Sequence, residues 1–171
     1  SEKGILTDQE DILPYVTEQR GRFVGATSVV IKPASTKEVS AVVKLCSDEE
    51  VAIVPQGGNT SLVSGSIPFT EDNAIVLNLS RMASIRSIDP VNNTITVDAG
   101  CVLQTIQEHA KKYDRLFPLS LGAEGTCQIG GNIASNAGGI NVIRYGNTRN
   151  LVLGLEVVTP TGEVWDGLKA L

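Results

Sequence analysis

The chain has 171 residues, enough for one ordinary domain with a hydrophobic core. Its net charge of −5 and pI near 4.9 argue against a nucleic-acid partner, because no basic stripe is available to neutralise phosphates. Aromatic residues are only 4% of the chain, so base stacking is not expected, and any bound phosphate must be held mainly by backbone amides.

The three cysteines, Cys46, Cys101 and Cys127, lie far apart without a Cys-x-x-Cys spacing. They therefore indicate reduced thiols, with neither a zinc site nor a disulfide. No signal peptide and no run of about 18 apolar residues is found, so we expect no membrane span. We expect a cytoplasmic protein, or one in an organellar matrix if a transit peptide was removed.

The first half of the chain predicts a parallel arrangement. Residues 1–22 are polar and weakly patterned, which predicts a helical or irregular lead-in. Residues 28–31 form a short β-branched run that predicts a strand. Residues 35–46 open with a Ser-x-x-Glu capping box and continue with apolar residues at helical spacing. Residues 51–54 predict a second strand, so the order strand, helix, strand predicts a βαβ unit.

The second half predicts an antiparallel arrangement with one helix. A third strand is expected at residues 74–79, and residues 102–113 have the apolar spacing of an amphipathic helix. Turn signals then separate further short apolar runs. The antiparallel strands are expected at residues 85–89, 94–99, 151–158 and 163–165.

Two glycine-rich runs give the strongest indication of function. The first covers residues 55–62 (PQGGNTSL), directly after the second predicted strand, where ligands bind in α/β sheets. The second covers residues 118–139 (PLSLGAEGTCQIGGNIASNAGG). Consecutive small residues let backbone amides point the same way and form an anion-binding nest. Two such nests predict a diphosphate between them, with an extended cofactor along the second run.

The familiar nucleotide motifs are absent from the sequence. It contains no P-loop and no Gly-x-Gly-x-x-Gly fingerprint after the first strand, and neither glycine run contains a lysine. This absence favours a buried diphosphate over a transferable phosphate.

The two runs in this order, followed by residues 144–164 (RYGNTRNLVLGLEVVTPTGEV), resemble the FAD-binding domain of the vanillyl-alcohol-oxidase/p-cresol-methylhydroxylase flavoprotein superfamily. Within this superfamily the chain is most similar to the D-2-hydroxyacid dehydrogenases, which act on D-lactate, glycolate or D-2-hydroxyglutarate. The resemblance implies an α+β fold in two subdomains, a small βαβ subdomain and a mostly antiparallel sheet with helices, truncated at the C-terminus. It implies a lead-in at residues 1–22, subdomains at about 23–80 and about 81–171, and a substrate domain outside this chain.

The resemblance also assigns cofactor contacts. The loop that resembles a diphosphate cradle contains Pro55, Gly57, Gly58, Asn59, Thr60 and Ser61. The stretch that runs beside the flavin contains Pro118, Leu119, Gly122, Gly125 and Thr126. The loop that closes over the ribityl chain and diphosphate contains Ile129, Gly130, Gly131, Asn132, Ser135 and Asn136. Related oxidases with covalent flavin have a histidine where this chain has Asn59, so the implied FAD is non-covalent.

The resembled enzymes oxidise a D-2-hydroxy acid to a 2-oxo acid and pass the electrons to a quinone, an electron-transfer protein or oxygen. This chemistry needs a base, a cationic clamp for the carboxylate and sometimes a metal. The sequence offers no such base and no Asp/His cluster, so we expect no catalytic residue, no metal site and no turnover by this chain alone. Two alternatives stay open: the FAD domain of an alditol or sugar-lactone oxidase, and a non-catalytic nucleotide-binding domain.

Some other residues are of types often found in functional sites, but their positions in the sequence do not favour such a role. His109 lies on the polar side of the second predicted helix and is expected to be solvated. Cys127 lies inside the second run and is either close to the flavin or a small buried filler. Arg144 and Arg149 are expected to be solvated, and Trp165 is expected in a hairpin core.

Overall fold

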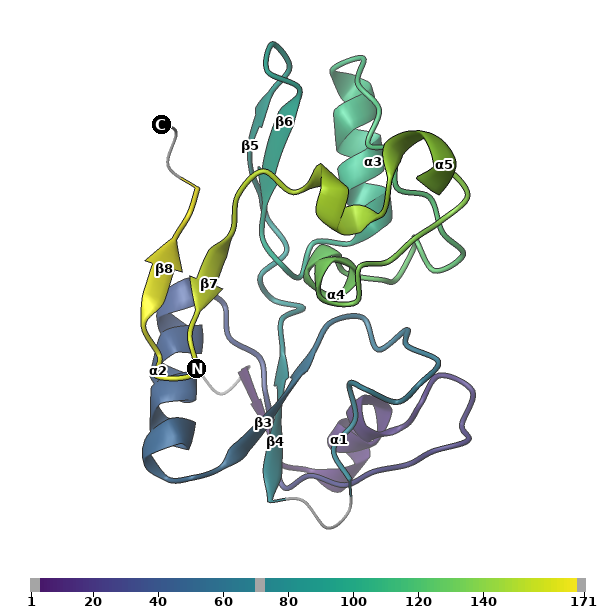
Figure 1. Cartoon of the computed structure of the whole chain (residues 1–171). Coiled ribbons are helices and arrows are strands. Elements are labelled where there is room, and N and C mark those ends of the chain that lie inside the picture. Colours follow the sequence, from purple (N-terminus) through teal and green to yellow (C-terminus); the bar gives the residue numbers. More distant parts are fainter. Residues whose placement is uncertain (1–3, 70–72, 169–171) are drawn as a thin grey trace. The chain divides into compact units, whose positions relative to one another are not determined.

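The computed structural model describes residues 4–69 and 73–168 and divides into two compact units (Figure 1). The first unit comprises Ser1–Arg81 and Gly154–Leu171, and the second comprises Met82–Leu153. Both units mix helices with strands, which confirms the predicted α+β class.

A four-stranded sheet in the order β1-β2-β4-β3 forms the centre of the first unit. β1 (Ile5–Leu6) runs antiparallel to β2 (Val30–Ile31), whereas β2, β4 (Ala74–Asn78) and β3 (Ala52–Gln56) are parallel. The helix α2 (Thr36–Asp48) connects β2 to β3, so the predicted parallel unit is confirmed, with β4 inserted between its two strands. Every residue of β4 is buried, as expected of a central strand whose first four residues, Ala74 to Leu77, are apolar.

The predicted capping box at the start of α2 forms with a shift of one residue. The Ser35 Oγ accepts a hydrogen bond from the Glu38 backbone N–H at 3.2 Å. The Glu38 carboxylate accepts from the backbone N–H of Ala34 at 2.7 Å, one residue before the cap. Cys46 is the most deeply buried residue of this helix, and the three valines of its predicted apolar face are half-buried. The helix therefore lies at the surface of its unit.

The segment expected to be a lead-in contributes to the core of the first unit. It contains the helix α1 (Gln9–Val16), which is capped by the Asp8 side chain. Ile12 and Val16 are 1% and 4% exposed and pack with buried residues of β2 and β4. Two apolar residues one helical turn apart are too weak a signal in a polar stretch, which explains why the sequence pattern missed this role.

The C-terminal hairpin belongs to the first unit. Its strands β7 (Glu156–Val158) and β8 (Val164–Asp166) pair antiparallel, as predicted, and β7 contacts α2 (Figure 1). The hydroxyl of Ser40 on α2 donates a hydrogen bond to the carbonyl of Gly162 in the hairpin turn. The second unit therefore ends at Leu153, whereas the second subdomain was expected to extend to about residue 171. The contact between the hairpin and α2 joins distant segments and leaves no local signal in the sequence.

The second unit has more helix and less sheet than the sequence predicts. Its described strands β5 (Ile85–Asp89) and β6 (Thr94–Val97) form one antiparallel hairpin. The predicted helix α3 is confirmed at Leu103–Lys112. The further short helices are α4 (Ile129–Ala134), α5 (Val142–Tyr145) and the 3-10 helix η2 (Thr148–Leu151). The sequence did not predict α4, because two of its first three residues are glycines, which disfavour helix.

Two small apolar clusters fix α3 against the second glycine run. Ile106 packs with Cys101 and Ile129, while Leu103 packs with Leu119 and Cys127. These contacts give the glycine-rich segment a rigid base despite its composition. No helix in the described part of the chain is long and apolar enough to cross a membrane.

We predict that Ile12→Ala destabilises the protein by about 3 kcal/mol, because it removes a buried side chain and leaves a cavity. The neighbouring Leu13 is 54% exposed, so Leu13→Ala serves as the control and should cost less than about 1 kcal/mol. Urea denaturation of both variants measures the difference. Equal costs would mean that residues 1–22 are a separate lead-in after all.

Candidate functional site

The first glycine run begins at the end of β3, which is held in place by hydrogen bonds. Gln56, the last residue of β3, is 2% exposed, and its side-chain amide donates to the carbonyls of Tyr15 at 2.8 Å and Ser66 at 2.9 Å. The Asn78 side chain, at the end of β4, donates to the Gln56 Oε1 and to the Gly57 carbonyl, both at 3.1 Å. The loop therefore leaves the sheet in a fixed direction.

Asn59 holds the middle of this loop by its side chain. Its backbone is left-handed, with φ +50°, a conformation that asparagine tolerates better than most residues. The side-chain Nδ2 donates to the carbonyls of Thr17 at 2.9 Å and Pro14 at 3.3 Å, and the Oδ1 accepts from the Ser66 hydroxyl at 2.9 Å. The polar atoms of this side chain are engaged with protein, so we infer that it shapes the loop.

The backbone amides of residues 57–62 have no protein acceptor among the described residues. Native proteins pair nearly all such groups unless solvent or a ligand takes them. A run of free amides containing a left-handed residue has the character of an anion-binding nest. This loop can therefore bind an anion through its main chain.

The second glycine run combines buried anchors with exposed backbone. Leu119 and Ile129 are 3% and 6% exposed and belong to the core clusters, so only their main chains can face a ligand. The exposed members of the predicted set are Gly122, Gly125, Thr126, Gly131 and Ser135. Residues 118–136 all lie in the second unit, whereas residues 55–61 all lie in the first.

The two adjacent glycines of α4 have different roles. A Cβ at Gly130 would lie 2.9 Å from the Ala99 Cβ and 3.0 Å from the Ala99 carbonyl oxygen. The Gly130 amide also donates to that carbonyl at 2.8 Å, so this glycine allows close packing. A Cβ at Gly131 would meet nothing within 4 Å. Gly131 therefore presents bare backbone to open space, where a ligand can approach closely.

Two buried acceptors beside these glycines lack donors. Gln128 and Asn132 are 7% and 6% exposed. Among the described residues, neither the Gln128 Oε1 nor the Asn132 Oδ1 has a hydrogen-bond partner. Unsatisfied buried groups are rare and need an explanation, such as a donor on a bound ligand. Asn132 was predicted as a site residue, whereas Gln128 was missed, because no sequence pattern marks it.

Several other polar side chains of the second run are used by the fold. The Ser135 hydroxyl donates to the carbonyl four residues earlier at 2.8 Å, and the Asn136 Oδ1 accepts from the Arg149 backbone N–H at 3.1 Å. The Arg149 guanidinium donates to the carbonyls of Ile133 at 2.9 Å and Ala134 at 2.6 Å. Arg149 is exposed, as expected, and its side chain also caps the C-terminus of α4.

The remaining candidates differ in burial and contacts. Cys127 is 2% exposed, and burial raises the pKa of its thiol despite a hydrogen bond with the Asn132 side chain, so it is a neutral core residue. Trp165, expected in a hairpin core, is 60% exposed. His109 is half-buried with its ring centroid 5.5 Å from that of Tyr113. Within residues 4–69 and 73–168, no cluster of His, Cys, Asp or Glu could hold a metal ion.

Each unit of this α+β chain therefore carries a glycine run with groups open to a ligand. One loop offers free amides to an anion, and the other offers open backbone beside two buried acceptors. A family model described as an FAD binding domain matches residues 27–167, and this chain belongs to that family.

Curated relatives match nearly the whole chain. It is 40% identical over 170 residues to a probable mitochondrial D-2-hydroxyglutarate dehydrogenase of Oryza sativa subsp. indica, covering 99% of this chain and 30% of that protein. It is 40% identical over 169 residues to a D-2-hydroxyglutarate–pyruvate transhydrogenase of Saccharomyces cerevisiae, covering 98% and 34%. It is 39% identical over 165 residues to a putative mitochondrial D-lactate dehydrogenase of Schizosaccharomyces pombe, covering 96% and 31%. The chain thus spans about a third of the length of these relatives.

Solved structures share the fold at lower identity. An alkyldihydroxyacetonephosphate synthase matches with a TM-score of 0.87 at 20% identity, over 97% of this chain and 32% of that one. The 6-hydroxy-D-nicotine oxidase of Arthrobacter nicotinovorans matches with a TM-score of 0.81 at 22% identity, over 95% and 35%. These matches confirm the predicted fold of FAD-linked oxidases.

We predict opposite effects of alanine at the two glycines of α4. Gly130→Ala should destabilise the protein by about 1–3 kcal/mol, because its methyl group would overlap Ala99. Gly131→Ala should be neutral or stabilising by up to about 1 kcal/mol, because its methyl group enters open space and alanine favours helix. Thermal denaturation without ligand measures both, and a large loss at Gly131 would contradict the assignment.

Proposed function

We propose that this protein is a flavin-dependent oxidoreductase that oxidises a D-2-hydroxy acid to a 2-oxo acid, and that the described residues form its FAD-binding part. The observation that carries this proposal is the 40% identity over 170 residues to a relative named as a D-2-hydroxyglutarate dehydrogenase. That match includes both glycine runs, so it covers the residues that would hold the cofactor.

The residues present fit FAD. The free amides of residues 57–62 suit its diphosphate, which the acidic chain could not attract by net charge. Hydroxyl and N–H groups of the ribityl and flavin portions are the donors that the Gln128 Oε1 and Asn132 Oδ1 lack. The open space at Gly131 supports close approach of a ligand to the backbone.

The flavin would be held without a covalent bond. The Asn59 side chain, at the position where covalent relatives carry histidine, is a carboxamide already engaged with Thr17, Pro14 and Ser66. A carboxamide is a poor nucleophile. The Cys127 thiol is buried with a raised pKa, which keeps it protonated at neutral pH.

Bound FAD would supply the two-electron acceptor for oxidation at the hydroxyl-bearing carbon. The described residues contribute binding and orientation of the cofactor. We place the base that removes the hydroxyl proton, and the clamp for the substrate carboxylate, in the length that the relatives have beyond this match. The electron acceptor, whether a quinone, an electron-transfer protein or oxygen, stays a prediction.

Several relatives are named as mitochondrial, which supports an organellar matrix as the location of this protein. Fractionation of source cells with detection of the native protein checks this assignment.

We predict that the purified chain retains FAD, seen as paired flavin absorbance bands that comigrate with protein in gel filtration. Denaturation should release all of the flavin into the supernatant, because attachment is non-covalent. Gly131→Val should abolish retention by filling the space beside the backbone. Ala41→Val, which places the same side chain on an exposed position of α2, is the control and should retain flavin. Equal flavin content in both variants would contradict the site.

We predict no turnover by residues 1–171 with D-lactate or D-2-hydroxyglutarate and a dye acceptor, even when loaded with FAD. The physical reason is that the sequence leads us to expect no base for the proton transfer, and no cluster of His, Cys, Asp or Glu among the described residues could hold a metal ion. The intact protein should reduce the dye with one of these acids. Turnover by the short chain would place catalytic groups within it, and an intact protein inactive on both acids would refute the substrate class.

A further inference from the structure

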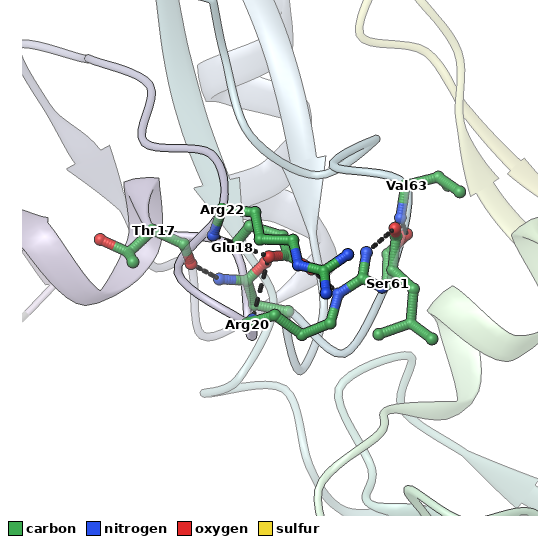
Figure 2. A network of polar contacts seen from close by, with 8 residues as sticks. Thr17, Glu18, Arg20, Arg22, Ser61 and Val63 are labelled. Atoms are coloured by element: carbon green, nitrogen blue, oxygen red, sulfur yellow. Dashed lines mark hydrogen bonds and ion pairs between the residues drawn. The ribbon is translucent and has the colours of Figure 1, made fainter.

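Residues 17–24 form a tight turn packed against the first glycine run (Figure 2). Thr17 and Val24 pair across its base, and the Glu18 backbone N–H donates to the Phe23 carbonyl at 2.9 Å. Glu18 is only 2% exposed, which is unusual for a charged side chain. A carboxylate buried at the base of a surface turn loses its contacts with water, and hydrogen bonds within the protein must replace them.

The Glu18 carboxylate is fully engaged by its own turn. One oxygen accepts from the backbone N–H groups of Arg20 at 2.9 Å and Arg22 at 3.3 Å. The other accepts from the Arg20 Nε at 3.0 Å (Figure 2). Burial opposes ionisation, but the hydrogen bonds from Arg20 and Arg22 outweigh it and lower the Glu18 pKa below its ordinary value. The pair is therefore ionised at neutral pH, and the Arg20 side chain is held in one orientation.

That orientation directs Arg20 onto the glycine run. Its Nη2 donates to the Leu62 carbonyl at 2.7 Å. Asn59, three residues earlier, is tied to the carbonyls of Thr17 and Pro14 in the same N-terminal segment. The first glycine run is thus fixed at two points, through the Asn59 side chain and through the Leu62 carbonyl. Neither of these hydrogen bonds uses a backbone amide of residues 57–62.

We propose that Glu18 and Arg20 are positioning residues that hold residues 59–62 in the anion-binding conformation, so that affinity for the FAD diphosphate depends on their ion pair. This inference rests on the proposed binding of FAD. Arg20 acts through the shape of the loop, because Glu18 already balances its charge. The Arg20 side chain is 41% exposed, and the contacts of the pair lie within residues 17–24 and the first glycine run. The consequence of losing it is local, in the loop.

Arg20→Met and Arg22→Met separate this role from charge alone. Both remove one positive charge from the same turn. Arg22 is exposed, however, and within the described residues its polar contact is made by the backbone N–H and not by the side chain. We expect Arg20→Met to raise the Kd for FAD about tenfold or more, the scale of lost charge-assisted hydrogen bonds, and Arg22→Met to change it less than about threefold. Fluorescence titration of the apoprotein with FAD measures both values, and melting temperatures confirm that both variants fold.

Hydrogen exchange distinguishes a local effect on the loop from a general loss of structure, because it measures protection separately at each segment. In the wild type, FAD should slow exchange at residues 57–62 and at residues 129–136. In Arg20→Met, protection should fail at residues 57–62 and persist at residues 129–136. Arg20→Lys keeps the charge but cannot donate from two points of a planar fork, so it should not restore the Kd.

Glu18→Gln supplies the pH test. A group with a lowered pKa contributes its full stabilisation above its ordinary pKa and loses it as the pH falls through the lowered pKa. Loop protection in Glu18→Gln should therefore be weaker than in the wild type at neutral pH, and the difference should disappear in acid.

Three results would overturn the inference while FAD binding by the wild type stands: equal Kd values for Arg20→Met and Arg22→Met, full rescue by Arg20→Lys, or unchanged protection of residues 57–62 in Arg20→Met. A wild-type protein that binds no FAD contradicts the proposed function itself, and the inference falls with it.

Discussion

The first glycine run is governed by one constraint: its amides must stay unpaired while its shape stays fixed. A chain with net charge −5 has little long-range attraction for a diphosphate, so the binding that we propose would depend on local N–H groups. Those groups cannot also hold the loop in place. The structure meets both needs by fixing the loop through side chains and carbonyls, at Gln56, Asn59 and Leu62.

The second run follows the same principle with different means. Here apolar anchors, Leu119 and Ile129, fix the segment from below, and Gly130 allows it to pack closely on Ala99. The outer face is left with bare backbone at Gly131 and with two acceptors that lack donors. In each unit, side chains fix the shape of the glycine run, and backbone and buried amide groups remain available for the proposed ligand contacts.

The same fold is shared by proteins with different named activities. An alkyldihydroxyacetonephosphate synthase and a 6-hydroxy-D-nicotine oxidase have this fold at 20% and 22% identity. A shared fold does not by itself define a reaction. The choice of a D-2-hydroxy acid therefore rests on the 40% identity to named dehydrogenases, and not on the fold.

The sequence by itself determined the family, the α+β class, most of the strands and the two major helices, because hydrophobic period, capping residues and glycine runs are local signals. Only the tertiary structure showed that α1 belongs to the core, that the β7–β8 hairpin packs on α2 and that Trp165 is exposed. Tertiary contacts also decided the separate tasks of Gly130 and Gly131, the unpaired Gln128 and the link from Glu18 through Arg20 to Leu62. Each of these findings depends on contacts between residues distant in sequence or on the space around a residue. Such contacts and spaces leave no periodic or local pattern in the sequence.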